Sequence, residues 1–208
     1  WDGTGRADLN ITGGTISNSN QSVTYGGGNF SGAGILNLNA GTLVTRGFAK
    51  NGSSTAYLNF NGGTLKSAAS SATFLPALSA VHINGAFGSN AGGLAVDTAG
   101  YDDTIAAGLL APTGNGVTAI PVTAGGSGYI GAPFVSVNGG GGSGASAIAN
   151  MVDDGTGSGT LSVGSVTITN PGKDYTGVPT ISLTGGAGSG ATFGAVSTGA
   201  NTSGGLVK

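Results

Sequence analysis

Two adjacent pairs of aspartate are the clearest candidates for chemistry in this 208-residue chain, which contains no glutamate. Asp102, Asp103, Asp153 and Asp154 could bind Ca²⁺, or could supply the two carboxyl groups of a glycosidase. Each pair also lies at a predicted turn, where aspartate commonly accepts hydrogen bonds from nearby backbone N–H groups. Because no Asp-x-Asp-x-Asp loop surrounds either pair, a turn role is favoured, and the four residues are weak calcium candidates.

Few other side chains could support catalysis. His82 is the only histidine and cysteine is absent, so a catalytic triad would depend on one residue, and a thiolate metal site is excluded. The glycine-rich run at 139–144 lacks the lysine of a phosphate-binding loop, and a strand rather than a helix is expected after it. We therefore expect a protein that is not an enzyme and needs no cofactor, with calcium as the one exception to test.

Two tyrosines could contact a ligand. Tyr129 and Tyr175 each follow a glycine-rich turn, and each could stack on a sugar ring. Packing over the adjoining Pro133 and Pro179 is the simpler role for both rings. A carbohydrate-binding module is therefore one alternative function, with a surface glycan as its partner.

The elements that would position these residues begin with a line of sequence that repeats in the first half of the chain. The copies start at residues 9, 36 and 58, and a looser copy starts at 81. Apolar residues alternate with polar ones, mostly asparagine, and in the first three copies a Gly-Gly or Ala-Gly corner precedes Thr-Leu or Thr-Ile. This pattern predicts a strand, a corner and a second strand in each coil of a β-solenoid.

Stacking of such coils about 4.8 Å apart would align equivalent side chains. The expected interior columns are Leu9, Leu36, Leu58 and Val81, and Ile11, Leu38, Phe60 and Ile83. Asn10, Asn37 and Asn59 would form a third column. Its amides would either hydrogen-bond along the stack or face water.

The segment Leu58-Asn59-Phe60-Asn61-Gly62-Gly63-Thr64-Leu65 and its copies resemble the autotransporter-associated β-strand repeat. The resemblance covers about residues 7–110. It implies a right-handed parallel β-helix of a large secreted or surface bacterial protein, of a kind usually associated with adhesion. It supplies no catalytic residue.

The second half of the chain carries a different repeat, with a period of 46 residues that relates Tyr129 to Tyr175 and Pro133 to Pro179. Each unit reads as three strands, expected at about 117–123, 133–138 and 145–152, and again at 162–169, 179–184 and 191–197. The unit resembles a Gly-Tyr-x-x-x-Pro repeat of bacterial surface proteins and phage structural proteins. A β-sandwich, a β-prism-like stack and a continued solenoid all fit it. We expect an all-β chain with two domains, 1–112 and 113–208.

The composition limits the partners. Six Lys and Arg against eight Asp give a formal net charge of -2, and no basic patch of the kind that nucleic acid needs is present. No apolar run reaches the roughly 18 residues of a membrane span, so membrane insertion is not expected.

The last residues are a candidate assembly edge. Gly204, Gly205, Leu206, Val207 and Lys208 lie where the first strand of a third 46-residue unit would begin. An incomplete strand leaves a sheet edge that can pair with another copy, so we expect a homo-oligomer or a filament.

These expectations converge on a structural section of an extracellular or cell-surface bacterial fibre, adhesin or surface assembly. The second alternative is a polysaccharide-active β-helix enzyme of a surface or phage spike protein. Asp97, Asp102 and Asp103 would be its only acidic candidates in the first domain, and no Lys or Arg lies close to them in sequence.

Overall fold

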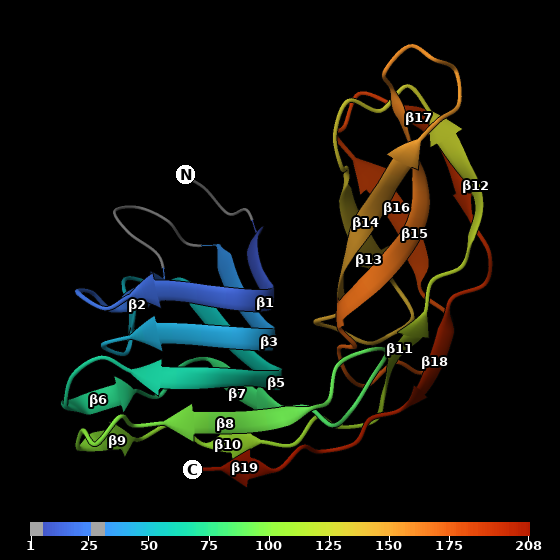
Figure 1. Cartoon of the computed structure of the whole chain (residues 1–208). Helices are drawn as coiled ribbons and strands as arrows, with labels where there is room; N and C mark the ends of the chain where they lie inside the picture. Colours follow the sequence, from blue (N-terminus) through green and yellow to red (C-terminus); the bar gives the residue numbers. More distant parts are fainter. Residues whose placement is uncertain (1–5, 26–31) are drawn as a thin grey trace. The chain divides into compact units, whose positions relative to one another are not determined.

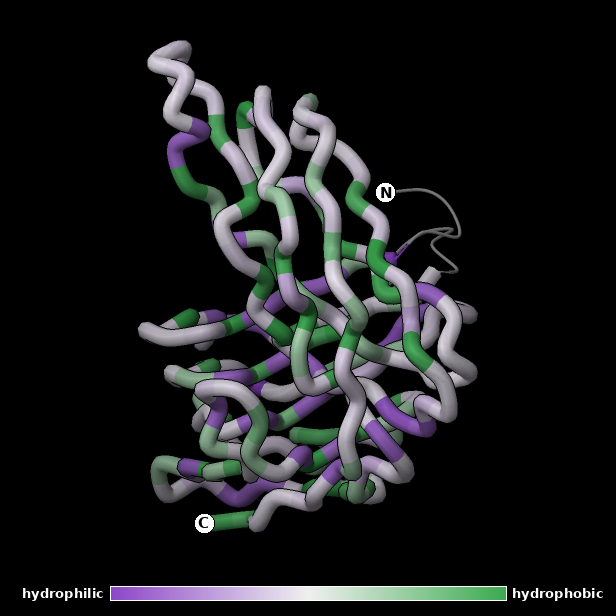
Figure 2. Tube along the Cα trace, turned by 90° about the vertical axis from the view of Figure 1, so that its right-hand side faces the viewer, coloured by the Kyte–Doolittle hydropathy of each residue, from purple (hydrophilic) through white to green (hydrophobic). Residues whose placement is uncertain are grey.

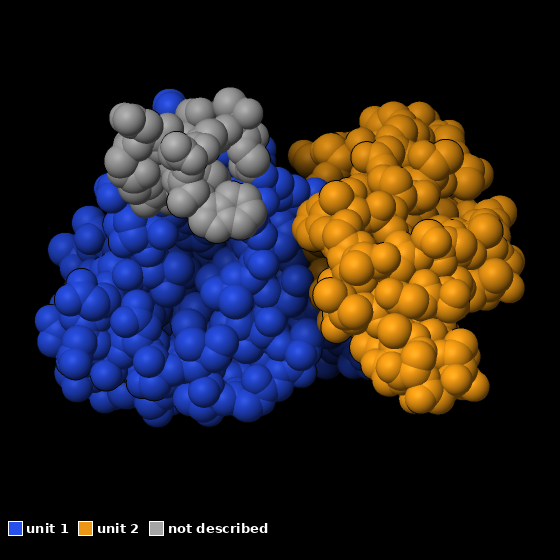
Figure 3. Space-filling model, turned by 90° about the horizontal axis from the view of Figure 1, so that it is seen from above, with its two compact units in different colours: residues 1–112, 202–208 blue, residues 113–201 orange. Residues whose placement is uncertain are grey.

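The computed structural model describes residues 6–25 and 32–208, and these residues form strands, turns and bends without any helix. The chain divides into two compact units: unit 1 comprises residues 1–112 and 202–208, and unit 2 comprises residues 113–201 (Figure 3). Unit 2 is thus inserted in the chain of unit 1. The division at residue 112 agrees with the sequence pattern, whereas residues 202–208 lie in unit 1 rather than in the second domain.

Unit 1 is built from parallel strands (Figure 1). In chain order they are β1 (Arg6–Asn18), β2 (Val23–Tyr25), β3 (Ala33–Thr45), β4 (Phe48–Lys50), β5 (Thr55–Ser67), β6 (Ser71–Leu75), β7 (Ala80–Ile83), β8 (Gly93–Asp97), β9 (Asp103–Ile105), β10 (Leu109–Leu110) and β19 (Leu206–Val207). The long strands β1, β3 and β5 pair side by side, and β7 and β8 pair with the two halves of β5. β10 pairs with β7, and β19 pairs with β8. Two further pairs are β2 with β4 and β6 with β9.

The register confirms the predicted interior columns. Leu9, Leu36, Leu58 and Val81 lie opposite one another in successive strands, as do Ile11, Leu38, Phe60 and Ile83. Hydrophobic and hydrophilic stretches alternate along the stacked runs of this unit (Figure 2). From β3 onward, both columns are buried and join Leu43, Leu65 and Leu94 in one apolar core. Burial of these apolar columns is the main stabilising term of the unit.

The asparagine column hydrogen-bonds along the stack. The Nδ2 of Asn37 donates to the Oδ1 of Asn10 at 2.8 Å, and the Nδ2 of Asn59 donates to the Oδ1 of Asn37 at 2.7 Å. His82 ends this ladder, with its Nδ1 3.2 Å from the Oδ1 of Asn59.

A second amide ladder, which the sequence pattern did not predict, runs beside the corner that the glycines form. The Nδ2 of Asn61 donates to the Oδ1 of Asn39 at 2.8 Å, and the Nδ2 of Asn84 donates to the Oδ1 of Asn61 at 2.6 Å. All three side chains are buried. Each ladder therefore fixes the register of neighbouring strands by polar contacts that a slip of one residue would break.

We call β1, β3, β5, the pair β7 and β8, and the pair β10 and β19 the five layers of unit 1. A corner divides each layer into two halves, and the layers differ at this corner. In the first layers, glycines with positive φ make it tight, as at Gly14 (φ 68°) and Gly41 (φ 74°). In the fourth layer, the chain leaves after β7 and returns at β8, with residues 84–92 between. In the fifth layer, it leaves after β10 and returns at β19, and the whole of unit 2 lies between.

Unit 2 is antiparallel throughout the pairings that the structure describes. Its strands are β11 (Asn115–Ala119), β12 (Val122–Ser127), β13 (Phe134–Asn138), β14 (Ser146–Asp153), β15 (Leu161–Asn170), β16 (Thr180–Thr184), β17 (Ser189–Phe193) and β18 (Ser197–Ala200). The six predicted strands are present, with the first and the last each broken in two. A continued solenoid is the wrong interpretation for this unit, because its glycine-rich links reverse the chain instead of advancing it by one layer.

An internal two-fold relation organises unit 2. Ser136 and Ser182 occupy the same position of the two 46-residue repeats, and they lie opposite each other in the β13–β16 pair. The pair of Ala147 with Ile168 in β14–β15 likewise has its counterpart in Val122 with Phe193 in β12–β17. Each repeat therefore completes the sheets of the other, so neither repeat has a core of its own.

Candidate functional site

The outer edge of β1 exposes aliphatic side chains whose partners in the next strand are buried. Among the described residues, β1 pairs with β3 alone. Leu9 is 46% exposed and Ile16 is 41% exposed, whereas their neighbours in the next layer, Leu36 and Leu43, are buried. This edge, which we call the β1 edge, therefore has the side chains of an inner layer without the layer that would cover them.

The opposite edge of unit 1 also exposes aliphatic side chains, of which Leu206 lies opposite the buried Leu94. In the described chain, β10 pairs with β7 alone and β19 with β8 alone. Leu110, Leu206 and Val207 are 47%, 51% and 66% exposed. We call this the β10–β19 edge.

The structure corrects the expectation for residues 204–208. They do not begin a third 46-residue unit but return to unit 1, where Leu206 lies opposite Leu94 and Val207 opposite Ala95. The N–H of Gly204 donates to the carbonyl of Ile83, and the carbonyl of Gly205 accepts from Leu94. One side of this segment is thus already paired inside the chain, and only its other side remains as an assembly edge.

Asp102 and Asp103 lie in a hollow of about 420 Å³ that Tyr101 and Lys208 also line. The Oδ1 of Asp103 accepts a hydrogen bond from the N–H of Ser71 at 3.1 Å, which ties β9 to β6. Its Oδ2 is buried without a hydrogen-bond partner among the described residues. No group of three or more His, Asp or Glu side chains in residues 6–25 and 32–208 is arranged to hold a metal ion.

Lys66 lies beside Asp97, although the two residues are 31 positions apart in the sequence. The Nζ of Lys66 is 2.5 Å from the Oδ2 of Asp97, because the two residues are partners in adjacent strands. The Lys66 ammonium and the N–H of Ala99 hold the pKa of Asp97 below its ordinary value. Asp97 is therefore committed to an exposed ion pair, and aligning the second halves of the copies could have revealed it.

Asp153 and Asp154 organise the loop that follows β14. The Oδ1 of Asp153 accepts from the N–H of Gly155 at 2.7 Å. Asp154 accepts from the hydroxyls of Thr160 and Thr156 at 2.5 and 2.7 Å, and from the N–H of Gly128 at 3.2 Å. These donors occupy the carboxylate of Asp154, which therefore serves the turn.

The pH dependence of unit 2 tests this role of Asp154. Hydrogen bonds from Thr160 and Thr156 hold the pKa of Asp154 well below its ordinary value. A lowered folded-state pKa stabilises the fold above the ordinary value near 4, and this contribution is lost as the pH falls toward the folded-state pKa. Asp154→Asn should therefore be less stable than the natural protein at about pH 7, and the difference should shrink below about pH 4.

Urea denaturation of both proteins at several pH values measures this difference. Thr160→Ala, which removes the strongest donor, should reduce the pH-dependent part in the same direction. A stability difference that stays constant from neutral to acid pH would show that the carboxylate charge has no role in the turn.

Tyr129 and Tyr175 are buried, at 2% and 3% exposure. Each ring packs on the glycine-rich link of the other repeat: Tyr129 covers Gly188, and Tyr175 covers Gly142. The N–H of Ile130 donates to the carbonyl of Gly186 at 2.9 Å, and the equivalent bond joins Thr176 to Gly140. Neither ring offers a face on which a sugar could stack, and packing over Pro133 and Pro179 stays a prediction.

Comparison with known proteins gives no family assignment: no protein-family model, no curated protein and no solved structure shows significant similarity to the chain. The described residues also contain no helix that is long and apolar enough to cross a membrane.

Proposed function

We propose that this chain is a structural section of an extracellular bacterial fibre, adhesin or surface assembly, and that unit 1 is a right-handed parallel β-solenoid that associates through its strand edges. The observation that carries the proposal is the pair of edges in unit 1. Each exposes an aliphatic side chain whose partner in the next strand is buried: Leu9 lies opposite Leu36 at the β1 edge, and Leu206 lies opposite Leu94 at the β10–β19 edge.

The two edges differ in sequence but belong to one stack. A second copy placed with its β1 against β10 and β19 would add a layer, pair the free backbone groups of both edges and bury Leu9 and Leu206. Such a contact joins different surfaces of identical chains. It therefore leaves one of each edge open, and it propagates into a filament where the geometry does not close into a ring.

The low charge of the chain supports association. Only 14 of its 208 residues carry a charged side chain, and the formal net charge is -2. Repulsion between stacked copies is therefore small, and electrostatics leaves the contact to backbone pairing and aliphatic burial.

Charged substitutions at each edge test the proposal. The purified chain should form filaments with a constant axial repeat in electron micrographs, and sedimentation should show concentration-dependent growth. Leu9→Lys and Val207→Lys should each abolish long filaments, because a charge on a free strand edge opposes pairing. Ile130→Lys, at a residue of unit 2 that is 78% exposed, is the matched control and should leave assembly unchanged.

Mixing the two edge variants gives the sharpest result. Each variant keeps one intact edge, so an equimolar mixture should form dimers and no longer species. A natural protein that stays monomeric at high concentration, or filaments that survive both substitutions, would disprove the proposal.

A further inference from the structure

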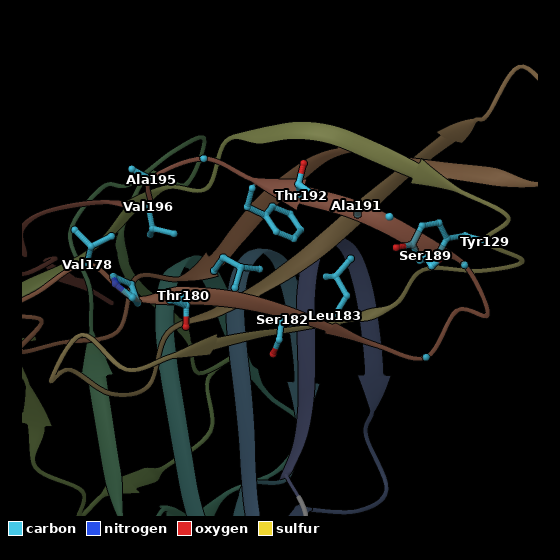
Figure 4. A pocket seen from close by; sticks show the side chains of 17 residues that line it. Tyr129, Val178, Thr180, Ser182, Leu183, Ser189, Ala191, Thr192, Ala195 and Val196 are labelled. Carbon is cyan, nitrogen blue, oxygen red and sulfur yellow. The ribbon is translucent and has the colours of Figure 1, made fainter.

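The two-fold relation of unit 2 is broken at one place, between β16 and β17. A cavity of about 780 Å³ opens there, lined by residues of the segment 178–196 and by Tyr129 (Figure 4). None of the lining residues carries a charge. Figure 4 shows Leu183 and Val196 directed into the space between the strands, whereas the hydroxyls of Thr180 and Ser182 point away from it.

The counterpart of this groove in the other repeat is closed by a strand pair. There β13 and β14 pair, with Phe134 opposite Ile148 and Val135 opposite Ala147. The equivalent strands β16 and β17 do not pair: within the described residues, β16 pairs with β13 alone and β17 with β12 alone. The edges of β16 and β17 therefore face an open groove. In the other half of unit 2, direct pairing of β13 with β14 closes the equivalent place.

The sequence explains the difference. The position of Ile148 is taken by Gly194, and the position of Phe134 is taken by Thr180. A stabilising aromatic–aliphatic cross-strand pair is thus replaced by a threonine and a glycine. In addition, Phe193 stands where the small Ala147 allows close approach.

We propose that the β16–β17 groove binds an extended peptide segment of another protein by strand addition. Backbone groups on the two edges would pair with the segment, and the uncharged lining would take its alternate side chains. The lining selects an uncharged segment, and the five-residue lengths of β16 and β17 set its span. Each strand of unit 2 already has a partner within the chain, and the occupant that we propose is therefore a segment of a different protein.

A peptide of residues 146–152, which belong to β14, is a suitable probe. In the closed half of unit 2, this segment pairs with β13, whereas β16, the equivalent of β13, has no such partner. A labelled peptide of this sequence should bind the full chain in a fluorescence anisotropy titration. A scrambled peptide of the same composition, and one with Ile148→Pro, should bind at least tenfold more weakly, because register and a backbone N–H are lost.

Two variants of the protein locate the binding. Phe193→Ala with Gly194→Ile copies the closed half into β17, so it should let β16 and β17 pair and should weaken peptide binding at least tenfold. Val178→Asp places a charge at a position that is 62% exposed and lines the groove; it should weaken binding without affecting the fold. Ile130→Asp, also exposed, should bind like the natural protein and serves as the matched control.

Three results would overturn the proposal. The first is no binding of the peptide by the natural protein. The second is equal binding of the ordered and the scrambled peptides, or binding that Val178→Asp leaves unchanged. The third is a dimer in sedimentation that Val178→Asp dissociates, since the groove would then be filled by a second copy. The test is independent of the edges of unit 1, which Leu9→Lys and Val207→Lys alter.

Discussion

Asn61→Ala is expected to lower the free energy of unfolding of unit 1 by about 2–4 kcal/mol. The Asn61 side chain is fully buried and makes two amide hydrogen bonds, one to Asn39 and one from Asn84. Alanine removes both bonds, and the loss of a partner costs about 1–3 kcal/mol for each buried polar group. Chemical denaturation followed by circular dichroism measures the total, and hydrogen exchange of the β5 amides shows where the loss is located.

Asn10→Ala is the matched control. Asn10 ends the other ladder, is only partly buried, and accepts one hydrogen bond, from Asn37. Its removal should cost about 1 kcal/mol. Equal effects at both positions would show that the position of an amide within a ladder is irrelevant to its contribution.

Gly188→Ala and Gly142→Ala are each expected to destabilise unit 2 by about 1–3 kcal/mol, although alanine is a conservative change elsewhere. A Cβ at either glycine would overlap the buried ring of the tyrosine from the other repeat. Tyr129 and Tyr175 would have to leave their packed positions, at the centre of the core that the two repeats share. Thermal unfolding of the purified variants measures the effect.

Gly131→Ala distinguishes this steric cause from a general cost of replacing glycine. A Cβ at Gly131 meets no atom within 4 Å, and its backbone does not require glycine. This substitution should therefore leave stability within about 0.5 kcal/mol of the natural protein. If all three variants behaved alike, the reciprocal packing of tyrosine on glycine would not be what holds the repeats together.

The sequence was sufficient for the local pattern of unit 1. Alternation of Leu and Asn around Leu36, Leu58 and Phe60 predicted strands, and the repeat predicted which residues align. Both follow from the two-residue period of a strand and from the need of each layer to cover its neighbour. The repeat of 46 residues likewise located the strands of unit 2.

Pairing between distant segments could not be predicted from the sequence in the same way. The return of Leu206 to β8 depends on a contact across more than 100 residues, and nothing in a five-residue tail specifies its partner. The salt bridge of Lys66 with Asp97 depends on the register of one layer over the next. The burial of Tyr129 depends on glycines of the other repeat, whose closeness only the antiparallel pairing of β13 with β16 establishes.

The corner between the halves of each layer has a consequence for engineering this protein. The corner consists of two glycines in one layer, of a short loop in another and of an 89-residue folded unit, residues 113–201, in a third. The strands on either side of the corner still pair with the neighbouring layer. The ends of that unit are held together, since the N–H of Asn201 donates to the carbonyl of Gly114 and its side chain to that of Thr113. A folded insert with adjoining termini adds little loop-closure entropy, which grows only by about 0.6 kcal/mol for each doubling of a flexible loop. The corner at Gly13 and Gly14, where an added Cβ would meet no atom within 4 Å, is thus a graft point at which each copy could display a foreign domain.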